Sequence, residues 1–158
     1  MIKRFAYILC ITLMLTTLAG CKKPAADNEA VSEYAEQMEN FFVGIKTLDE
    51  KINSLNPEDE NSLAELFIYL EQLEEQFKYL SEIDAPDEFN ATESLADEAY
   101  DYMIKANQYF ARTFEDNAYN EHTYEAGLEC YNRANKRVKY IISLLHGEIP
   151  TDEGVNVE

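Results

Sequence analysis

Chemistry in this 158-residue chain would have to come mainly from acidic side chains, because it has 31 Asp and Glu residues but only two histidines, His122 and His146. Neither histidine lies in a Glu-x-x-His motif, and a di-iron helical bundle needs two such motifs. No Cys/His spacing fits a zinc site, and residues 56–65 lack the glycine and ligand spacing of an EF-hand loop. Nucleophile-elbow, P-loop and dinucleotide motifs are also missing. We therefore expect no enzyme activity, no cofactor and no dedicated metal site.

Acidic residues also gather at two predicted turns. If these turns share one end of the molecule, their carboxylates form a weak binding site for a cation such as calcium. The residues of this predicted site are Glu58, Asp59, Glu60, Glu115 and Asp116. The plainer alternative is that acids near helix starts only complement the helix dipole.

The first twenty residues have the layout of a secretory leader. Lys3 and Arg4 precede a 16-residue uncharged run, 5–20, which is shorter than the ~20 residues a helix needs to cross a bilayer. A basic start, an apolar run and small residues at the exit predict a cleaved signal peptide over 1–20. A transmembrane start fits this run less well.

The leader ends in Leu18-Ala19-Gly20-Cys21, which resembles the lipobox of bacterial lipoproteins. The resemblance implies that the Cys21 thiol receives a diacylglyceryl group, that cleavage occurs before Cys21, and that fatty acids such as palmitate anchor the chain. The lipid bilayer is then a partner, and the location is the cell envelope. We expect the outer face of the cytoplasmic membrane, or the outer membrane in a Gram-negative cell. An ordinary signal peptide with a chance cysteine is the alternative.

The mature chain is strongly acidic. Because Lys3 and Arg4 are the only charged residues of the leader, the remainder carries 11 basic and 31 acidic side chains, a formal net charge of −20. Such a charge repels phosphate backbones, so nucleic acid is excluded as a partner. Residues 21–27 read as a lipidated tether, in which Lys22 and Lys23 lie at the anionic lipid surface. Cys130 then has no disulfide partner and is expected to be a buried, inert thiol.

Apolar residues recur at heptad spacing through four segments. This periodicity predicts an all-α fold, an antiparallel up-down-up-down four-helix bundle over 28–147 with helices of roughly 25–29 residues. The first two segments are Val31, Tyr34, Met38, Phe41, Ile45, Leu48, Ile52 and Leu55, then Leu63, Leu66, Leu70, Leu73, Phe77 and Leu80. The last two are Ala96, Ala99, Met103, Ala106, Phe110 and Phe114, then Tyr124, Gly127, Tyr131, Ala134, Val138, Ile141 and Leu145.

Proline and capping residues predict where the second helix begins and ends. The second helix begins at Pro57 or at Ser62, where Ser62 and Glu65 would form a capping box. Pro86 ends that helix.

The second half of the chain has weaker stop signals. Residues 115–121 form the third break, although a continuous helix through them is the competing interpretation. Gly147 is expected at the position after the last helix, and 148–158 is expected to be a disordered acidic tail.

Tyrosine is the one unusual aromatic component, because the mature chain has ten tyrosines and no tryptophan. Tyr102 and Tyr109 are seven residues apart, as are Tyr124 and Tyr131, so each pair lies on one face of its helix. These four residues are a candidate recognition face. The competing interpretation is a seam boundary, with packed rings and wet hydroxyl groups.

The segment from Ala85 to Glu148 is similar to small helical lipoproteins of Gram-positive bacteria whose function is not characterised. The similarity includes a proline-aromatic entry to the third helix and the ending Leu145-His146-Gly147-Glu148. It implies no activity. We expect a membrane-anchored surface lipoprotein that acts as a helical interaction module toward an envelope or surface protein. A small-ligand or ion-binding accessory lipoprotein is the alternative.

Overall fold

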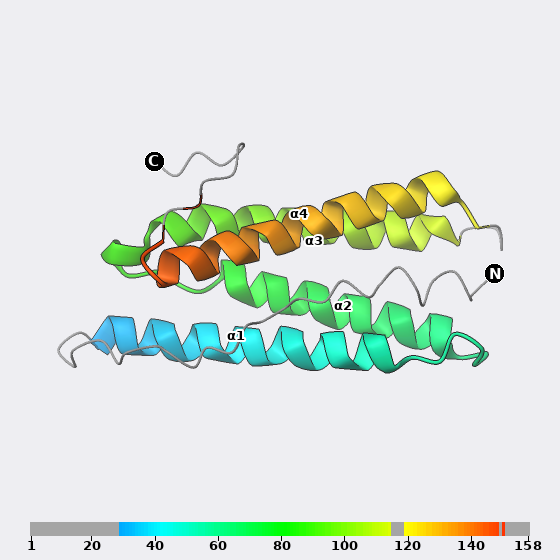
Figure 1. Cartoon of the computed structure of the whole chain (residues 1–158), viewed down its shortest axis with the longest axis horizontal. Helices are drawn as coiled ribbons and strands as arrows, with labels where there is room; N and C mark the ends of the chain where they lie inside the picture. Colours follow the sequence, from blue (N-terminus) through cyan, green and yellow to red (C-terminus); the bar gives the residue numbers. More distant parts are fainter. Residues whose placement is uncertain (1–28, 115–118, 149, 151–158) are drawn as a thin grey trace.

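The computed structural model describes residues 29–114, 119–148 and 150. This part of the chain forms four α-helices and one short 3₁₀ helix, η2 (Asp87–Phe89), and contains no strand. The α-helices are α1 (Glu29–Ser54), α2 (Ser62–Ser81), α3 (Ala91–Thr113) and α4 (Glu121–Leu145). Each helix packs mainly against its neighbours in sequence, and together they form an elongated bundle (Figure 1). The expectation of an all-helical bundle is confirmed for the described residues.

The heptad residues of the first two segments form one side of the core. Every seam residue of α1 from Val31 to Ile52 is buried, and Phe42 is buried as well. In α2, five of the six expected seam residues are buried, whereas Leu63 is only half-buried. An edge-on contact joins the two helices, with the ring centroids of Phe41 and Phe77 5.9 Å apart.

Helix α2 begins at Ser62, one of the two expected starts, but the expected capping box is wrong. With 20 residues, α2 is shorter than the expected 25–29, and so is α3 with 23. Ser62 and Glu65 do not form a capping box, because the Ser62 hydroxyl donates to the carbonyl oxygens of Asn56 and Asp59 instead of accepting from the helix. The preceding turn is held by the Asn56 side chain, whose Oδ1 accepts from the Glu58 amide at 3.1 Å.

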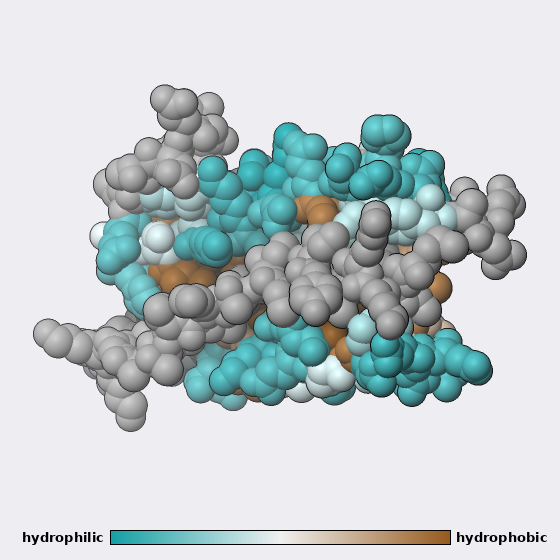
Figure 2. All heavy atoms as spheres, turned by 45° about the vertical axis from the view of Figure 1, so that its right-hand side comes forward, coloured by the Kyte–Doolittle hydropathy of each residue, from teal (hydrophilic) through white to brown (hydrophobic). Residues whose placement is uncertain are grey.

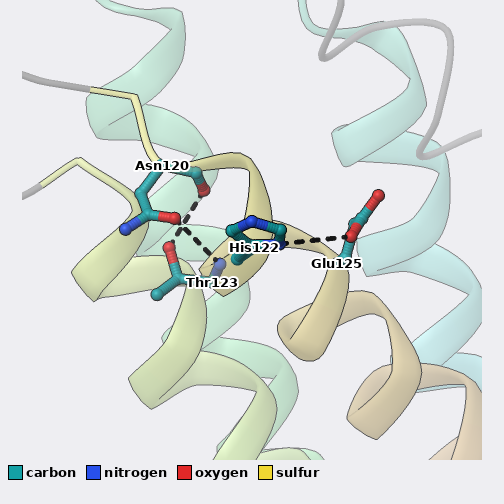
Figure 3. Close-up of polar contacts among 4 residues, drawn as sticks. All are labelled: Asn120, His122, Thr123 and Glu125. Atoms are coloured by element: carbon teal, nitrogen blue, oxygen red, sulfur yellow. Dashed lines mark hydrogen bonds and ion pairs between the residues drawn. The ribbon is translucent and has the colours of Figure 1, made fainter.

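The expected break between the third and fourth helices is present. α3 ends at Thr113 and α4 begins at Glu121, so a single continuous helix through this region is ruled out. The Asn120 amide donates to the Thr113 carbonyl at 3.0 Å and brings the two helix ends together. Asn120 also caps α4, because its Oδ1 accepts from the Thr123 amide at 3.3 Å (Figure 3).

The end of α4 follows the expectation for Gly147. This glycine has a φ of +74°, the left-handed conformation that commonly ends helices. Its amide donates to the Leu144 carbonyl at 2.9 Å, and the Glu148 amide donates to the Ser143 carbonyl at 2.8 Å. These two bonds make a complete Schellman motif, which satisfies carbonyl groups that the last helical turn would otherwise leave unpaired.

Small residues allow α3 and α4 to approach more closely than any other helix pair. Ala99 and Ala106 of α3 and Ala134 of α4 have no exposed surface. Gly127 lies against the ring of Phe110, so closely that a Cβ at this position would be 2.8 Å from two of its ring carbons. Hydrophilic side chains cover most of the outer surface visible in Figure 2, and hydrophobic ones show between the two halves of the bundle.

Candidate functional site

The four tyrosines of the expected recognition face lie in different environments. Tyr124 belongs to the core, with 2% of its surface exposed and its ring centroid 5.9 Å from that of Phe110. Tyr109 is half-buried on α3. Tyr102 contacts basic residues of α4, whereas Tyr131 faces α1 and α2. The structure therefore does not bring the four rings onto one common surface.

Tyr102 is the centre of a cluster of cations, which we call the Tyr102 cluster. The cluster consists of Tyr102, Lys105, Arg133 and Arg137. Lys105 Nζ is 5.3 Å from the ring centre, and the guanidinium carbons of Arg133 and Arg137 are 5.6 Å and 4.9 Å from it. All three cations are within the range in which an aromatic ring attracts positive charge.

Two members of the Tyr102 cluster also pair with carboxylates. Arg137 Nε donates to Glu98 Oε2 at 2.8 Å, which links α4 to α3, and the Arg137 side chain is only 13% exposed. Arg133 pairs with Glu129 one turn earlier on its own helix. Contacts with Tyr102 and with Glu129 raise the pKa of Arg133. The cluster thus holds fixed positive charge on the surface of α3 and α4.

The Tyr102 cluster borders an unusual stretch of an otherwise acidic chain. Residues 130–147 contain four Lys or Arg residues and no Asp or Glu, whereas the whole chain has a formal net charge of −18. The second half of α4 is therefore locally basic and suits an acidic partner surface.

Cys130 lies close to the Tyr102 cluster. Burial raises the pKa of its thiol, the positive charges of Arg133 and Lys105 lower it, and Glu129 raises it. The net effect is an increase, so the protonated thiol predominates at neutral pH and is a weak nucleophile. This supports the expectation of an inert cysteine, although Cys130 is half-buried rather than fully buried.

A second candidate site is a small pocket between α1, α2 and α4, which we call the Asn135 pocket. Its polar members are Asp49, Tyr131 and Asn135, and its apolar walls are Ile45, Leu73 and Phe77. The space open to the centre of a water molecule is about 10 Å³, which corresponds to a single water. The pocket therefore suits a very small guest.

The polar groups of the Asn135 pocket influence one another. Burial raises the pKa of Tyr131, the neighbouring Asn135 side chain lowers it, and the charge of Asp49 raises it. Burial also raises the pKa of Asp49, against a hydrogen bond from Asn53 that lowers it, and Glu50 adds a further increase. Although Asn135 lies beside Tyr131, Asn135 Nδ2 makes no hydrogen bond of normal geometry with any described residue.

The expected cation site is only partly within the described residues. Glu58, Asp59 and Glu60 are exposed in the turn before α2, and Asp59 Oδ1 accepts from the Asn61 amide at 2.9 Å. Glu115 and Asp116 lie outside the described residues. Within the residues that the structure describes, no three His, Cys, Asp or Glu side chains are grouped to hold a metal ion.

Both histidines lie at the ends of α4. His122 is in the first turn, where its Nδ1 is 4.0 Å from Glu125 Oε2, and 97% of its side chain is exposed (Figure 3). His146 is the exposed residue after the last turn. Within the described part of the chain, neither belongs to a group of three or more His, Cys, Asp or Glu side chains that could hold a metal ion.

Sequence reasoning did not single out Asn135 or the Arg137–Glu98 ion pair. Asn135 comes directly after the seam residue Ala134 and is buried as well. A polar residue next to the seam was therefore a sequence signal for a polar group inside the bundle. The ion pair joins residues 39 positions apart, so it depends on the register between α3 and α4, which composition does not reveal.

Cys21, the expected signal peptide of 1–20 and most of the expected 148–158 tail lie outside the described residues. None of the described helices is long and apolar enough to span a bilayer. The described residues belong to a broad structural class, the all-helical bundles. No protein-family model, no curated protein and no solved structure matches this chain.

Proposed function

We propose that this chain is a membrane-anchored bacterial surface lipoprotein whose helical bundle acts as a protein-interaction module. The observation that carries the proposal is the lipobox-like Leu18-Ala19-Gly20-Cys21, which lies eight residues before the start of α1 at Glu29. Eight extended residues span at most ~29 Å. An acylated Cys21 would therefore hold the bundle next to the bilayer, where a surface-tethered interaction module would act.

The bundle in this proposal is antiparallel, with an up-down-up-down order of helices. Only 55–61, 82–90 and 114–120 separate the four α-helices. Connections of this length favour neighbouring helices that run in opposite directions, because a parallel neighbour requires the chain to cross the full helix length. In this arrangement the start of α1 and the end of α4 share the membrane-proximal end.

The recognition surface in this proposal is the Tyr102 cluster together with the basic second half of α4. Tyrosine and arginine are enriched among residues that dominate binding energy. Positive charge in a chain of net charge −18 also gives the module one region that attracts an acidic partner. The proposed partner is an acidic envelope or surface protein.

The anchor can be tested by labelling growing cells with an alkyne fatty acid and comparing wild type with Cys21→Ser and Cys130→Ser. We expect label on wild type and on Cys130→Ser, and none on Cys21→Ser. The Cys130→Ser variant is the matched control, because it removes a cysteine that is not expected to carry lipid. Label that persists in Cys21→Ser, or an unlabelled wild type, would contradict the anchor.

The interaction module can be tested separately by photocrosslinking in intact cells. A photoreactive residue replaces Lys105, at the edge of the Tyr102 cluster, or Lys46, an exposed residue of α1. We expect a specific protein adduct from position 105 and none from position 46. Identical adduct patterns from both positions would contradict recognition by the Tyr102 cluster.

The alternative function, a small-ligand or ion-binding accessory lipoprotein, is favoured by one observation, the Asn135 pocket. The pocket has room for about one water-sized guest, so in this alternative an ion would bind there only in place of a water molecule. Chemical-shift mapping of the full chain with candidate ions separates the two functions. Saturable shifts at Tyr131 and Asn135, without any crosslinked partner, would favour the alternative.

A further inference from the structure

The Asn135 pocket contains an unpaired hydrogen-bond donor. Asn135 is 7% exposed, yet its Nδ2 lacks a partner among the described residues. Buried polar groups in native proteins are nearly always hydrogen-bonded, either to protein atoms or to ordered water. The donor also lines a concavity instead of packed apolar atoms. The Tyr131 hydroxyl lies beside this amide group and can accept from one of its two N–H groups, so at least one N–H group of Asn135 lacks an acceptor.

The chemistry of the pocket limits what that acceptor is. Asn135 Nδ2 offers a donor, whereas the carboxylate of Asp49 offers acceptor oxygens from another helix. A cation would leave the Asn135 donor unpaired, and an anion would face the Asp49 charge. A neutral guest that both accepts and donates satisfies the two groups together.

Size then decides among neutral guests. The space of about 10 Å³ for the centre of a water molecule is at the lower limit for one water, and it is too small for an alcohol or a sugar hydroxyl with its carbon frame. We propose that the pocket binds a single ordered water molecule, which accepts from Asn135 Nδ2 and donates to Asp49. This water would connect α4 to α1, two helices whose backbones come close at only a few positions.

The chain offers an internal control for the test. Asn132 lies on the same helix as Asn135, but its side chain is exposed. Water at an exposed amide group exchanges with bulk solvent within nanoseconds or faster, whereas a water enclosed beside Asn135 stays far longer. A long-lived water should therefore be detected beside the Asn135 amide group and not beside that of Asn132.

The experiment is a water-selective cross-relaxation measurement by NMR on the full chain. Between the water signal and the Asn135 side-chain amide protons, we expect a cross-peak with the sign that a long-lived water gives. We expect no cross-peak of that sign for the exposed Asn132. The absence of this cross-peak at Asn135 would overturn the proposal. This result needs no variant and does not depend on the proposed anchor or partner.

A second measurement uses Asn135→Leu, which removes the donor and fills the space. Magnetic relaxation dispersion should count one fewer long-lived water in this variant than in wild type. If the variant does not fold, the NMR measurement on wild type still decides the question. An unchanged count in a folded Asn135→Leu variant would contradict the proposed site.

Discussion

The hydroxyl oxygen of Tyr34 lies 2.6 Å from Oγ1 of Thr92 in a buried hydrogen bond that joins α1 to α3. The Thr92 hydroxyl already donates its proton to the Phe89 carbonyl at 2.7 Å, so Tyr34 is the donor. The rings of Tyr34 and Phe89 also stack, with centroids 5.6 Å apart and planes inclined by 21°. A single tyrosine therefore fastens the start of α1 to η2 and to the first turn of α3.

Removing the Tyr34 hydroxyl and removing the Thr92 hydroxyl should lower the free energy of unfolding by different amounts. Tyr34→Phe leaves Thr92 bonded to Phe89 and should lower the free energy of unfolding by about 1 kcal/mol. Thr92→Val leaves both the Tyr34 hydroxyl and the Phe89 carbonyl without this partner and should cost about 1–3 kcal/mol. Urea unfolding followed by circular dichroism measures both. Equal losses would contradict the assigned direction of the hydrogen bond.

The two internal glycines of the helices should respond oppositely to alanine. A Cβ on Gly127 would be 2.8 Å from the ring of Phe110, which is 1% exposed and has no room to move. We expect Gly127→Ala to lower the free energy of unfolding by about 1–3 kcal/mol through overpacking.

Gly44→Ala is the matched control for this prediction. A Cβ there would meet only the amide end of Gln76, a long side chain that can turn away. The gain in helix propensity is up to about 1 kcal/mol, so this variant should be as stable as wild type or more stable. A similar loss in both variants would show that close packing at Gly127 is not the cause.

The two arginines of the Tyr102 cluster should also differ in their contribution to stability. Arg137→Met removes an ion pair to Glu98 and a cation–ring contact, from a side chain that is 13% exposed. We expect a loss on the order of 1 kcal/mol. Arg133→Met should cost less, as measured by thermal unfolding, because the Arg133 side chain is 51% exposed, its ion pair is with Glu129 of its own helix, and its distance to the Tyr102 ring centre is 5.6 Å against 4.9 Å for Arg137. The opposite ranking would contradict a structural role for Arg137.

High pH should destabilise the bundle through Tyr124. Burial raises the pKa of Tyr124 from 10.0 to about 12, and Tyr119 contributes further. The folded state therefore keeps the neutral phenol while the unfolded chain ionises, so this stabilisation is complete below pH 10 and is lost as the pH rises toward 12. Tyr124→Phe should lose less stability between pH 10 and 12 than wild type does. Identical pH profiles in urea unfolding would refute this assignment.

Much of the fold could be predicted because heptad spacing reports directly which residues face inward. The residues of α1 and α3 show this best, since every seam residue from Val31 to Ile52 and from Ala96 to Phe110 is buried. The start of α2 was harder, because Ser62 can either accept from its helix or donate to an earlier carbonyl. The tight turn at Asn56 places the carbonyl groups of Asn56 and Asp59 close to the Ser62 hydroxyl, which therefore donates to them.

The candidate sites were less accessible to sequence reasoning. A spacing of seven places Tyr124 and Tyr131 on one helix face, but it does not state whether that face meets solvent or the core. The bulky neighbour Phe110 encloses Tyr124, whereas Tyr131 borders the Asn135 pocket. The contacts of Tyr102 with Arg133 and Arg137 depend on the register of α3 against α4, a long-range property that short spacings do not contain.

The close approach of α3 and α4 also has a consequence for how the protein opens and closes. These two helices are consecutive, are separated in the sequence only by 114–120, and have the nearest backbones in the bundle, whereas α1 contacts mainly α2. Local contacts of this kind form quickly and resist sub-global unfolding. The α3–α4 hairpin is thus expected to form one cooperative unit, with the slowest amide hydrogen exchange under native conditions. α1 should be the first helix to detach, carrying any attached membrane anchor away from a hairpin that stays folded.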